Sequence, residues 1–183
     1  LWSPMGSTAN ITGRLAAKNI KGQNIQYNGA IQTAVAKLPN LNIGRTGFTE
    51  DTARSYGYDP VSVVACLDNK AHYYPEASLF IIKMTADRNT KELLGLQVLG
   101  LDGGAVDKVV DIAVTAISLK AKLEDLEDLD FAYAPPFSTA IHPFSHAVNV
   151  LLNKINGEFV TISPEEFRAI DLDDYKIMDV AIV

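Results

Sequence analysis

The chain has 183 residues, of which 48% are hydrophobic, and its formal net charge is −6. This length suits one soluble globular domain, or one domain with a fragment of another, that buries most of its apolar surface. The acidic charge, without a basic stripe, argues against nucleic acid as a partner, and no apolar run reaches the roughly 18 residues of a membrane helix.

The N-terminal part of the chain alternates helix and short-strand signals. Apolar residues at helical spacing predict a helix over 9–20, which Gly22 would end. Turn residues interrupt the stretch 25–47, which predicts short strands there. Thr49 can cap a short helix through Tyr56, because its hydroxyl can accept hydrogen bonds from backbone N–H groups of the first turn.

The middle of the chain is rich in strand-forming residues. Three runs of Val, Ile, Leu and Phe, at 61–68, 78–86 and 92–101, have short polar connections and predict an antiparallel meander. A helix is expected over 105–119, where apolar residues share one face. Strands followed by helices predict an α+β fold, an antiparallel sheet with its helices packed on one face.

The C-terminal part carries further helix signals. An acidic run predicts a short, solvated helix over 123–129, and a longer helix is expected over 143–154. A capping box with proline at the first helical position starts another helix at 163–166. The apolar pattern at 176–180 is typical of a buried strand.

One segment of this sequence is neither an ordinary helix nor a central strand. Pro135 and Pro136 remove two backbone donors and fix φ, and Ala134 before them is pushed out of the helical region. We therefore expect a rigid, extended segment that presents Tyr133 and Phe137 as aromatic prongs. Such prongs indicate a partner, a cofactor or a pocket.

Four motifs together resemble a known family. They are the Leu-Gly-x-Gln-x-x-Gly strand at 94–100, the Tyr-Ala-Pro-Pro-Phe-Ser segment at 133–138, the Tyr-Tyr-Pro hairpin at 71–77 and the helix at 9–20. The strand at 94–100, a helix that opens at 106–108, the acidic turn at 123–126 and the segment at 133–138 follow one another in an order that resembles the C-terminal dimerisation domain of the FAD-dependent pyridine nucleotide–disulfide oxidoreductases. The hairpin and the helix at 9–20 agree with this resemblance, whose nearest branch contains the coenzyme A–disulfide reductases, NADH oxidases and NADH peroxidases. The hairpin departs from the family pattern at Glu76, where glycine is usual.

The resemblance implies a division of the chain and a parent activity. Residues 1–24 would end an FAD domain, 25–155 would form the dimerisation domain, and 156–183 would be a linker with the possible start of a rhodanese-like domain. The chain would then be a fragment of a flavin-dependent NAD(P)H:disulfide oxidoreductase or NADH oxidase. FAD and NAD(P)H are implied for the parent, and no cofactor is expected in the isolated fragment.

The same resemblance implies partners and sites. The chain would pair with itself as a homodimer, and the parent would reduce coenzyme A disulfide, a related small thiol or persulfide, or oxygen. A phenol can donate a hydrogen bond to a developing thiolate without ionising. The implied catalytic residues are Tyr133 with Tyr73 or Tyr74, the flavin-facing residues are Met5, Gly6 and Ser7, and the interface residues are Pro135, Pro136 and Phe137. Alternatively, the three tyrosines are interface residues with satisfied hydroxyls.

The lone cysteine and two histidines need separate interpretations. Cys66 lies in an apolar strand pattern and is expected to be structural and buried, and a single cysteine favours a reducing, cytoplasmic compartment. His142 and His146 stand four apart, but no third ligand is nearby and no metal site is expected. The His142-Pro143 pair also resembles the end of glutathione reductase–like enzymes, where the histidine is an acid–base partner.

Two alternative functions stay open at this point. The chain can be a non-catalytic dimerisation or interaction module that only reuses the fold, or part of a rhodanese-fused coenzyme A–persulfide or polysulfide reductase. The family's redox cysteine and Gly-rich nucleotide-binding turns are missing from these 183 residues. The isolated chain is therefore not expected to carry out the thiol chemistry, whatever its parent does.

Overall fold

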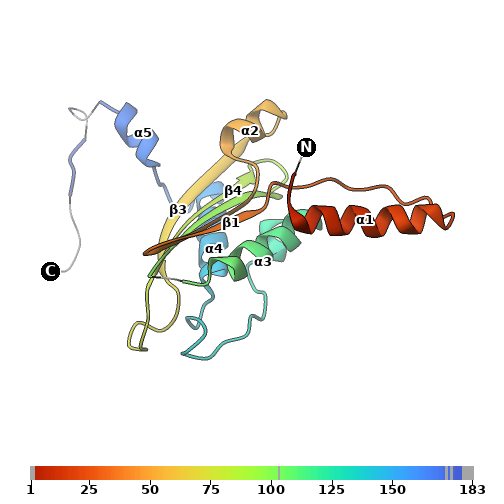
Figure 1. Ribbon diagram of the computed structural model, residues 1–183. Helices are drawn as coiled ribbons and strands as arrows, with labels where there is room; N and C mark the ends of the chain where they lie inside the picture. Colours follow the sequence, from red (N-terminus) through yellow and green to blue (C-terminus); the bar gives the residue numbers. More distant parts are fainter. Residues whose placement is uncertain (1–2, 103, 172, 174, 179–183) are drawn as a thin grey trace.

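A computed structural model of the protein describes residues 3–102, 104–171, 173 and 175–178. Five strands form one sheet, and helices precede, cover and follow it (Figure 1). In chain order the elements are α1 (Gly6–Ile20), β1 (Ala34–Leu38), β2 (Leu41–Gly47), α2 (Glu50–Ser55), β3 (Pro60–Asp68), β4 (Leu79–Asp87), β5 (Leu93–Leu101), α3 (Val106–Ser118), the 3-10 turn η1 (Leu123–Asp125), α4 (Pro143–Asn156) and α5 (Pro164–Ala169). The described residues include no helix long and apolar enough to cross a membrane.

The sheet is antiparallel throughout, with the strand order β1-β2-β5-β4-β3. Strands β3, β4 and β5 form the predicted meander, with Ala65 opposite Ile82 and Ile82 opposite Val98. The β1–β2 hairpin joins the free edge of β5, where Gly44 lies opposite Val98. The predicted α+β class is therefore confirmed.

Two helices cover one face of this sheet. Helix α3 packs over β5 and β2, and α4 packs over β3 and β4. Side chains from both layers form a continuous core of buried residues, among them Ile82, Met84, Leu96, Val98, Val109, Val110, Phe144, Val148 and Leu151. Because strand side chains alternate between faces, the neighbours of these residues point to the other side of the sheet.

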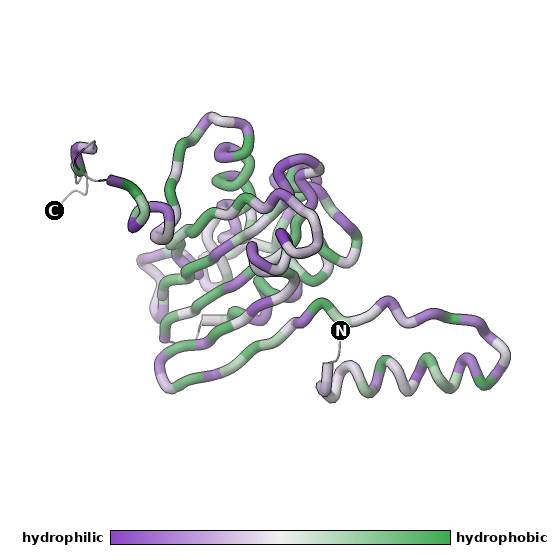
Figure 2. Tube along the Cα trace, turned by 90° about the horizontal axis from the view of Figure 1, so that it is seen from above, coloured by the Kyte–Doolittle hydropathy of each residue, from purple (hydrophilic) through white to green (hydrophobic). Residues whose placement is uncertain are grey.

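The N-terminal helix stands apart from this core. No residue of α1 is buried, and in both Figure 1 and Figure 2 the helix extends away from the sheet as a separate arm. It begins at Gly6, three residues before the predicted start, and Gly22 follows its end with a φ of 88°. An amphipathic helix gains most of its stability from packing, and the described residues bury no side chain of α1.

Several expectations need correction. The predicted helix over 123–129 is only the single turn η1, followed by a turn at 126–128, because one turn already buries Leu123 and Leu126 is buried directly after it. The C-terminal capping box is confirmed, since the Ser163 hydroxyl accepts a hydrogen bond from the Glu166 N–H at 3.1 Å.

The strand predicted at 176–180 is not observed over its described part, residues 176–178. Residues 176–178 have no regular structure, and Ile177 and Met178 are exposed. Asp179 and Val180 lie outside the described residues. The division at 24 and 155 and the rhodanese-like start therefore stay predictions.

The tight crossing between β5 and the end of β2 gives a first test of the fold. A Cβ added at Gly95 would overlap the carbonyl oxygen of Phe48, whose own N–H donates to Leu94 O at 2.8 Å. We expect Gly95→Ala to lower the free energy of unfolding by about 1–3 kcal/mol or more, because backbone must move. Urea denaturation of Gly13→Ala, on α1 with open space around it, is the matched control and should show no loss.

Candidate functional site

Two segments that carry predicted site residues meet at one end of the sheet. The β3–β4 connection at 69–78 and the segment 129–142 before α4 both lie at the lower end of Figure 1. Between them is a cavity of about 630 Å³, which we call the hairpin pocket. It is lined by Asn69, Lys70, Glu76, Phe80, Asp102, Gly104, Ala105, Lys108, Val109, Pro136, Phe137, His142 and Pro143.

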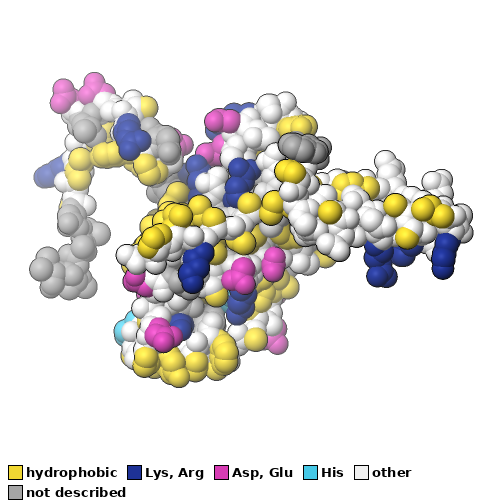
Figure 3. All heavy atoms as spheres, in the orientation of Figure 1, with side chains coloured by type: hydrophobic (Ala, Val, Ile, Leu, Met, Phe, Trp, Pro, Cys, Tyr) yellow, Lys and Arg dark blue, Asp and Glu magenta, His cyan; other side chains and the backbone are white. Residues whose placement is uncertain are grey.

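The aromatic prongs are exposed, as predicted. Tyr133 is 51% exposed and Phe137 74% exposed, and hydrophobic side chains gather over the lower loops in Figure 3. The segment is not extended throughout, however, because the chain turns at 135–137. The Ala134 carbonyl accepts hydrogen bonds from the N–H groups of Phe137 at 2.8 Å and Ser138 at 3.2 Å. The turn, together with the prolines, fixes where the two rings project.

The predicted tyrosines do not form one site within the chain. Tyr73 and Tyr74, 69% and 37% exposed, lie on the hairpin, but neither lines the pocket. Tyr133 instead borders a separate cavity of about 300 Å³ with Ser138 and His142. The Ser138 side-chain oxygen is buried there without a hydrogen-bond partner. The structure thus brings the two segments together and leaves all three tyrosines exposed.

The flavin-facing candidates lie elsewhere. Met5 precedes α1 without a side-chain cap, and Gly6 and Ser7 form the first turn of the helix. Unpaired N–H groups at a helix start can meet an electron-rich ring edge or carbonyl oxygen. The start of α1 lies by the upper end of the sheet in Figure 1, away from the hairpin pocket. Within one chain these residues and the tyrosines do not share a site.

His142 is a buried structural cap for α4. Its side chain is 6% exposed, and Nδ1 accepts a hydrogen bond from the Phe144 N–H at 3.2 Å. The Phe131 ring lies 4.6 Å from the imidazole. Burial penalises the charged imidazole and the nearby charge of Lys108 repels it, so the pKa of His142 falls to about 4. A neutral imidazole at pH 7 with Nδ1 occupied is poorly suited to the acid–base role that the His-Pro pair suggested.

The other face of the sheet is open and partly apolar. Its central hollow of about 510 Å³ is lined by Ile43, Ile81, Leu99, Arg45, Lys83 and their neighbours. Cys66 lies on this face opposite Ile81 and is exposed, so the prediction that it is buried is wrong. Strand alternation explains the error, because an apolar run does not reveal which of two faces is covered.

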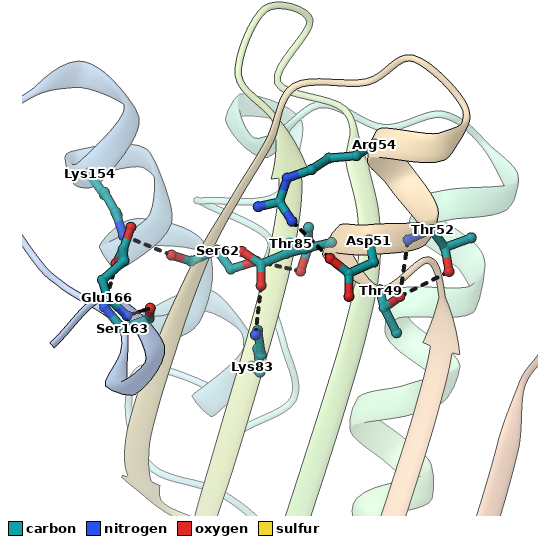
Figure 4. Close-up of polar contacts among 11 residues, drawn as sticks. Thr49, Asp51, Thr52, Arg54, Ser62, Lys83, Thr85, Lys154, Ser163 and Glu166 are labelled. Carbon is teal, nitrogen blue, oxygen red and sulfur yellow. Dashed lines mark hydrogen bonds and ion pairs between the residues drawn. The ribbon is translucent and has the colours of Figure 1, made fainter. Parts of the chain in front are cut away.

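Charged residues close the upper end of the open face. Lys83 forms an ion pair with Glu50 of α2 at 2.8 Å. Burial opposes ionisation of Glu50, yet the hydrogen bond and charge of Lys83 outweigh it and lower the pKa of Glu50. Beside this pair, Ser62 contacts Thr85 at 2.7 Å and its carbonyl accepts from Lys154 at 3.1 Å (Figure 4). These contacts tie α2 and α4 to β3 and β4.

Two lysines of the hairpin pocket were not predicted as site residues. Lys108 lies in the first turns of α3, and Lys70 begins the β3–β4 connection. The two lysines lie 38 positions apart in the sequence, and only the folded sheet brings them to the same cavity. Among the described residues, no three His, Cys, Asp or Glu side chains gather as a metal site.

Comparison with known proteins identifies the fold and then the family. The structure superposes on a NAD-dependent persulfide reductase from A. fulgidus with a TM-score of 0.82 and 34% identity, over 87% of this chain and 29% of that one. It matches reduced Bacillus anthracis CoADR-RHD equally well, with a TM-score of 0.82 and 32% identity, over 88% of this chain and 29% of that one.

Comparison of the sequence points to the same group of proteins as comparison of the structure. The family model of the pyridine nucleotide-disulphide oxidoreductase dimerisation domain matches residues 33–144, and the chain belongs to this family. A Pyrococcus furiosus NAD(P)H sulfur oxidoreductase (CoA-dependent) is 33% identical over 151 residues, which are 82% of this chain and 34% of that protein. The chain thus spans about a third of the length of this relative.

The low pKa of His142 predicts a pH dependence of stability. The folded pKa of about 4 lies below the unfolded value of 6.5, so the stabilisation is complete above pH 6.5 and is lost as the pH falls toward 4. His142→Asn keeps a cap acceptor without a group that titrates here. Denaturation at pH 7 and pH 4 should show the unsubstituted chain losing on the order of 2–3 kcal/mol more than the variant. Equal losses in both proteins would contradict this account.

Proposed function

We propose that this chain supplies the homodimer interface of a FAD-dependent NAD(P)H oxidoreductase and presents aromatic residues to the active site of the partner copy. The observation that carries the proposal is the exposure of Tyr133 and Phe137 on a segment fixed by two prolines and a turn. Exposed aromatic side chains held in one geometry lose little conformational entropy when they are buried against a partner.

The separation of the two half-sites supports the same proposal. The residues expected to face a flavin, Met5 to Ser7, lie at the start of α1, which in Figure 1 is away from the segments 69–78 and 129–142 that carry the tyrosines. A two-fold interface uses the same surface of both copies, so that a residue of one copy can meet a different residue of the other and the reverse contact is made as well. A homodimer can therefore bring Tyr133 of one copy near the flavin-side half-site of the other, which a monomer does not do.

We infer that the substrate of the longer protein is a coenzyme A disulfide or a related small thiol or persulfide. The relatives of this chain support the inference, because their names describe a CoA-dependent sulfur oxidoreductase and a persulfide reductase. Oxygen is the second candidate acceptor, since a Methanocaldococcus jannaschii NADH oxidase is 33% identical over 85% of this chain and 34% of its own length. FAD and NAD(P)H would be held by domains outside these residues.

The proposed role of Tyr133 is to donate a hydrogen bond. As a sulfur–sulfur bond is reduced, negative charge develops on the leaving sulfur, and a phenol O–H placed beside it stabilises that charge. In this role the phenol O–H only donates the hydrogen bond. The turn at 135–137 holds its backbone before the substrate arrives.

Substitution in the longer flavoprotein tests this role. Tyr133→Phe should lower turnover roughly 30- to 1,000-fold, equivalent to about 2–4 kcal/mol in the barrier, because one pre-organised donor is lost. Steady-state kinetics should show this while sedimentation and the flavin spectrum show an unchanged dimer. Tyr56→Phe is the matched control, since it removes another exposed phenol that stacks on Phe48 outside both cavities.

The result also separates the two interpretations of Tyr133. If Tyr133 is only an interface residue, the variant keeps normal turnover for each folded dimer and at most dissociates more readily. Unchanged turnover at a concentration where the dimer is intact would end the catalytic proposal.

A further inference from the structure

Strand β3 forms one edge of the sheet, because it is the last strand in the order β1-β2-β5-β4-β3. In an antiparallel pair, every second residue bonds to the neighbouring strand, and the residues between them point their N–H and C=O groups outward. Asn69, which follows β3, donates its N–H to Ser78 O at 2.8 Å. The odd-numbered residues of β3 therefore face β4, and even-numbered residues such as Val64 and Asp68 present their backbone groups at the free edge.

The start of this edge is already protected. Pro60 begins β3 and has no N–H, and the Ser62 carbonyl accepts a hydrogen bond from the Lys154 ammonium of α4 at 3.1 Å. This contact agrees with the outward direction of the even-numbered residues. Free backbone groups on an edge strand favour pairing with another extended segment. The part of the edge that is open to such pairing begins at Val64.

A segment of the same chain lies beside this edge. Residues 158–163, which we call the strap, connect α4 to α5, and 160–163 have no regular structure. A cavity of about 270 Å³, which we call the strap groove, lies between the strap and the edge. It is lined by residues of β3, β4, α4 and the strap, namely Ser62, Val63, Val64, Lys83, Val150, Lys154, Phe159, Thr161, Ile162 and Ser163.

The strap has the composition of a short strand. Every residue of the run Phe159-Val160-Thr161-Ile162 is aromatic or β-branched, and such residues favour strands. The side chain of Val160 is 89% exposed and that of Ile162 is 54% exposed. Within the described residues, no backbone hydrogen bond joins the strap to β3. Pairing would bury these side chains and satisfy the free backbone groups, and both changes favour closure of the groove.

The start of the strap is fixed to α4. The N–H groups of Glu158 and Phe159 donate to the carbonyl of Asn153, at 2.9 Å and 3.2 Å. Since the end of the strap continues into α5, only a few residues between two anchored ends have to move. A short segment held in this way loses little conformational entropy when it becomes ordered.

The end of the strap carries a charge that matches the groove. Ser163 caps α5, and its hydroxyl and N–H are bonded to Glu166. Hydrogen bonds from Ser163 lower the pKa of Glu166, and the positive charges of Lys154 and Lys83 lower it further. Figure 4 shows Glu166 and Ser163 beside Lys154. Both lysines line the strap groove, so their charges attract this end of the strap toward the edge.

We propose that the strap closes onto the free edge of β3 as a short sixth strand, antiparallel to β3, in which Thr161 and Val64 exchange backbone hydrogen bonds. In this register Val160 and Ile162 point to the face of the sheet that α4 covers. Closure protects the edge from pairing with other molecules and fixes where α5 lies against the sheet. This inference concerns a different part of the molecule from the proposed function and does not rest on it.

Amide hydrogen exchange of the 183-residue chain, followed by NMR, tests the closure. After correction for intrinsic rates, the Val64 amide should exchange roughly tenfold or more slowly than the Asp68 amide, which faces the same edge beyond the strap. Thr161→Pro removes the N–H that would pair with Val64 and places a proline ring against β3. In this variant the Val64 amide should exchange as fast as that of Asp68.

The matched control places proline one residue earlier. In the proposed register the N–H of Val160 points away from β3, and an edge strand tolerates proline at such a position. Val160→Pro should therefore leave the exchange of Val64 within about threefold of the unsubstituted chain. The amides of Ile82 and Val98 in the core should stay protected in both variants, which shows that the fold is intact.

Three outcomes would overturn the proposal. The first is a Val64 amide that exchanges as fast as that of Asp68 in the unsubstituted chain. The second is protection that Thr161→Pro leaves unchanged or that both proline variants remove. The third is protection that grows with protein concentration, which would assign the edge to a second copy of the chain. The measurement involves neither flavin nor turnover, so its result is independent of the test of Tyr133.

Discussion

The close approach of α3 to the sheet is the constraint on which the rest of the structure depends. A Cβ at Gly44 would lie 2.6 Å from Cγ2 of Val110, and one at Gly100 would lie 2.7 Å from Cγ1 of Val106. Only the missing side chains allow the helix to lie this close. The first turn of α3 is thereby set against the end of β5. That placement brings Lys108 into the same pocket as the β3–β4 hairpin and the segment before α4.

The two faces of the sheet consequently differ in what covers them. One face is fully occupied by α3 and α4, which form the core and hold the loops at the lower end. The other face keeps an apolar hollow whose lining includes Arg45 and Lys83. The aromatic segment 133–137 lies on neither face but at the end of the sheet, where it is free to contact another molecule. Exposed apolar side chains of this kind are typical of a dimerisation domain, in which the second copy covers them.

Local signals predicted the elements well but not their pairing or their covered faces. Periodicity, the Thr49 and Ser163 caps and the three apolar runs correspond to observed helices and strands. The pairing of β2 with β5 joins residues 48 to 60 positions apart, from Gly47 with Gly95 to Leu41 with Leu101, and no local pattern encodes it. The error at Cys66 and the unrecognised pocket lysines share this origin, because both depend on which residues the topology brings together.

The candidate site was predictable only in part, and for a physical reason. Tyr133 and Phe137 were found because two prolines restrict the backbone next to them, which is a property of the sequence itself. The turn at 135–137 was missed, because proline fixes φ and leaves ψ to be set by hydrogen bonds such as Phe137 N–H to Ala134 O. His142 looked like an acid–base residue until burial and its capping bond were seen to lower its pKa.

The central claim is that the segment around Tyr133 reaches the active site of a second copy. The most direct measurement replaces Tyr133 with the photocrosslinker p-benzoylphenylalanine in the longer flavoprotein and forms mixed dimers of ¹⁴N- and ¹⁵N-labelled chains. Mass spectrometry of the irradiated dimer should find crosslinked peptides that join the two labels, with residue 133 attached to the flavin-binding part of the other chain. Crosslinks that join only peptides of the same label would contradict the account.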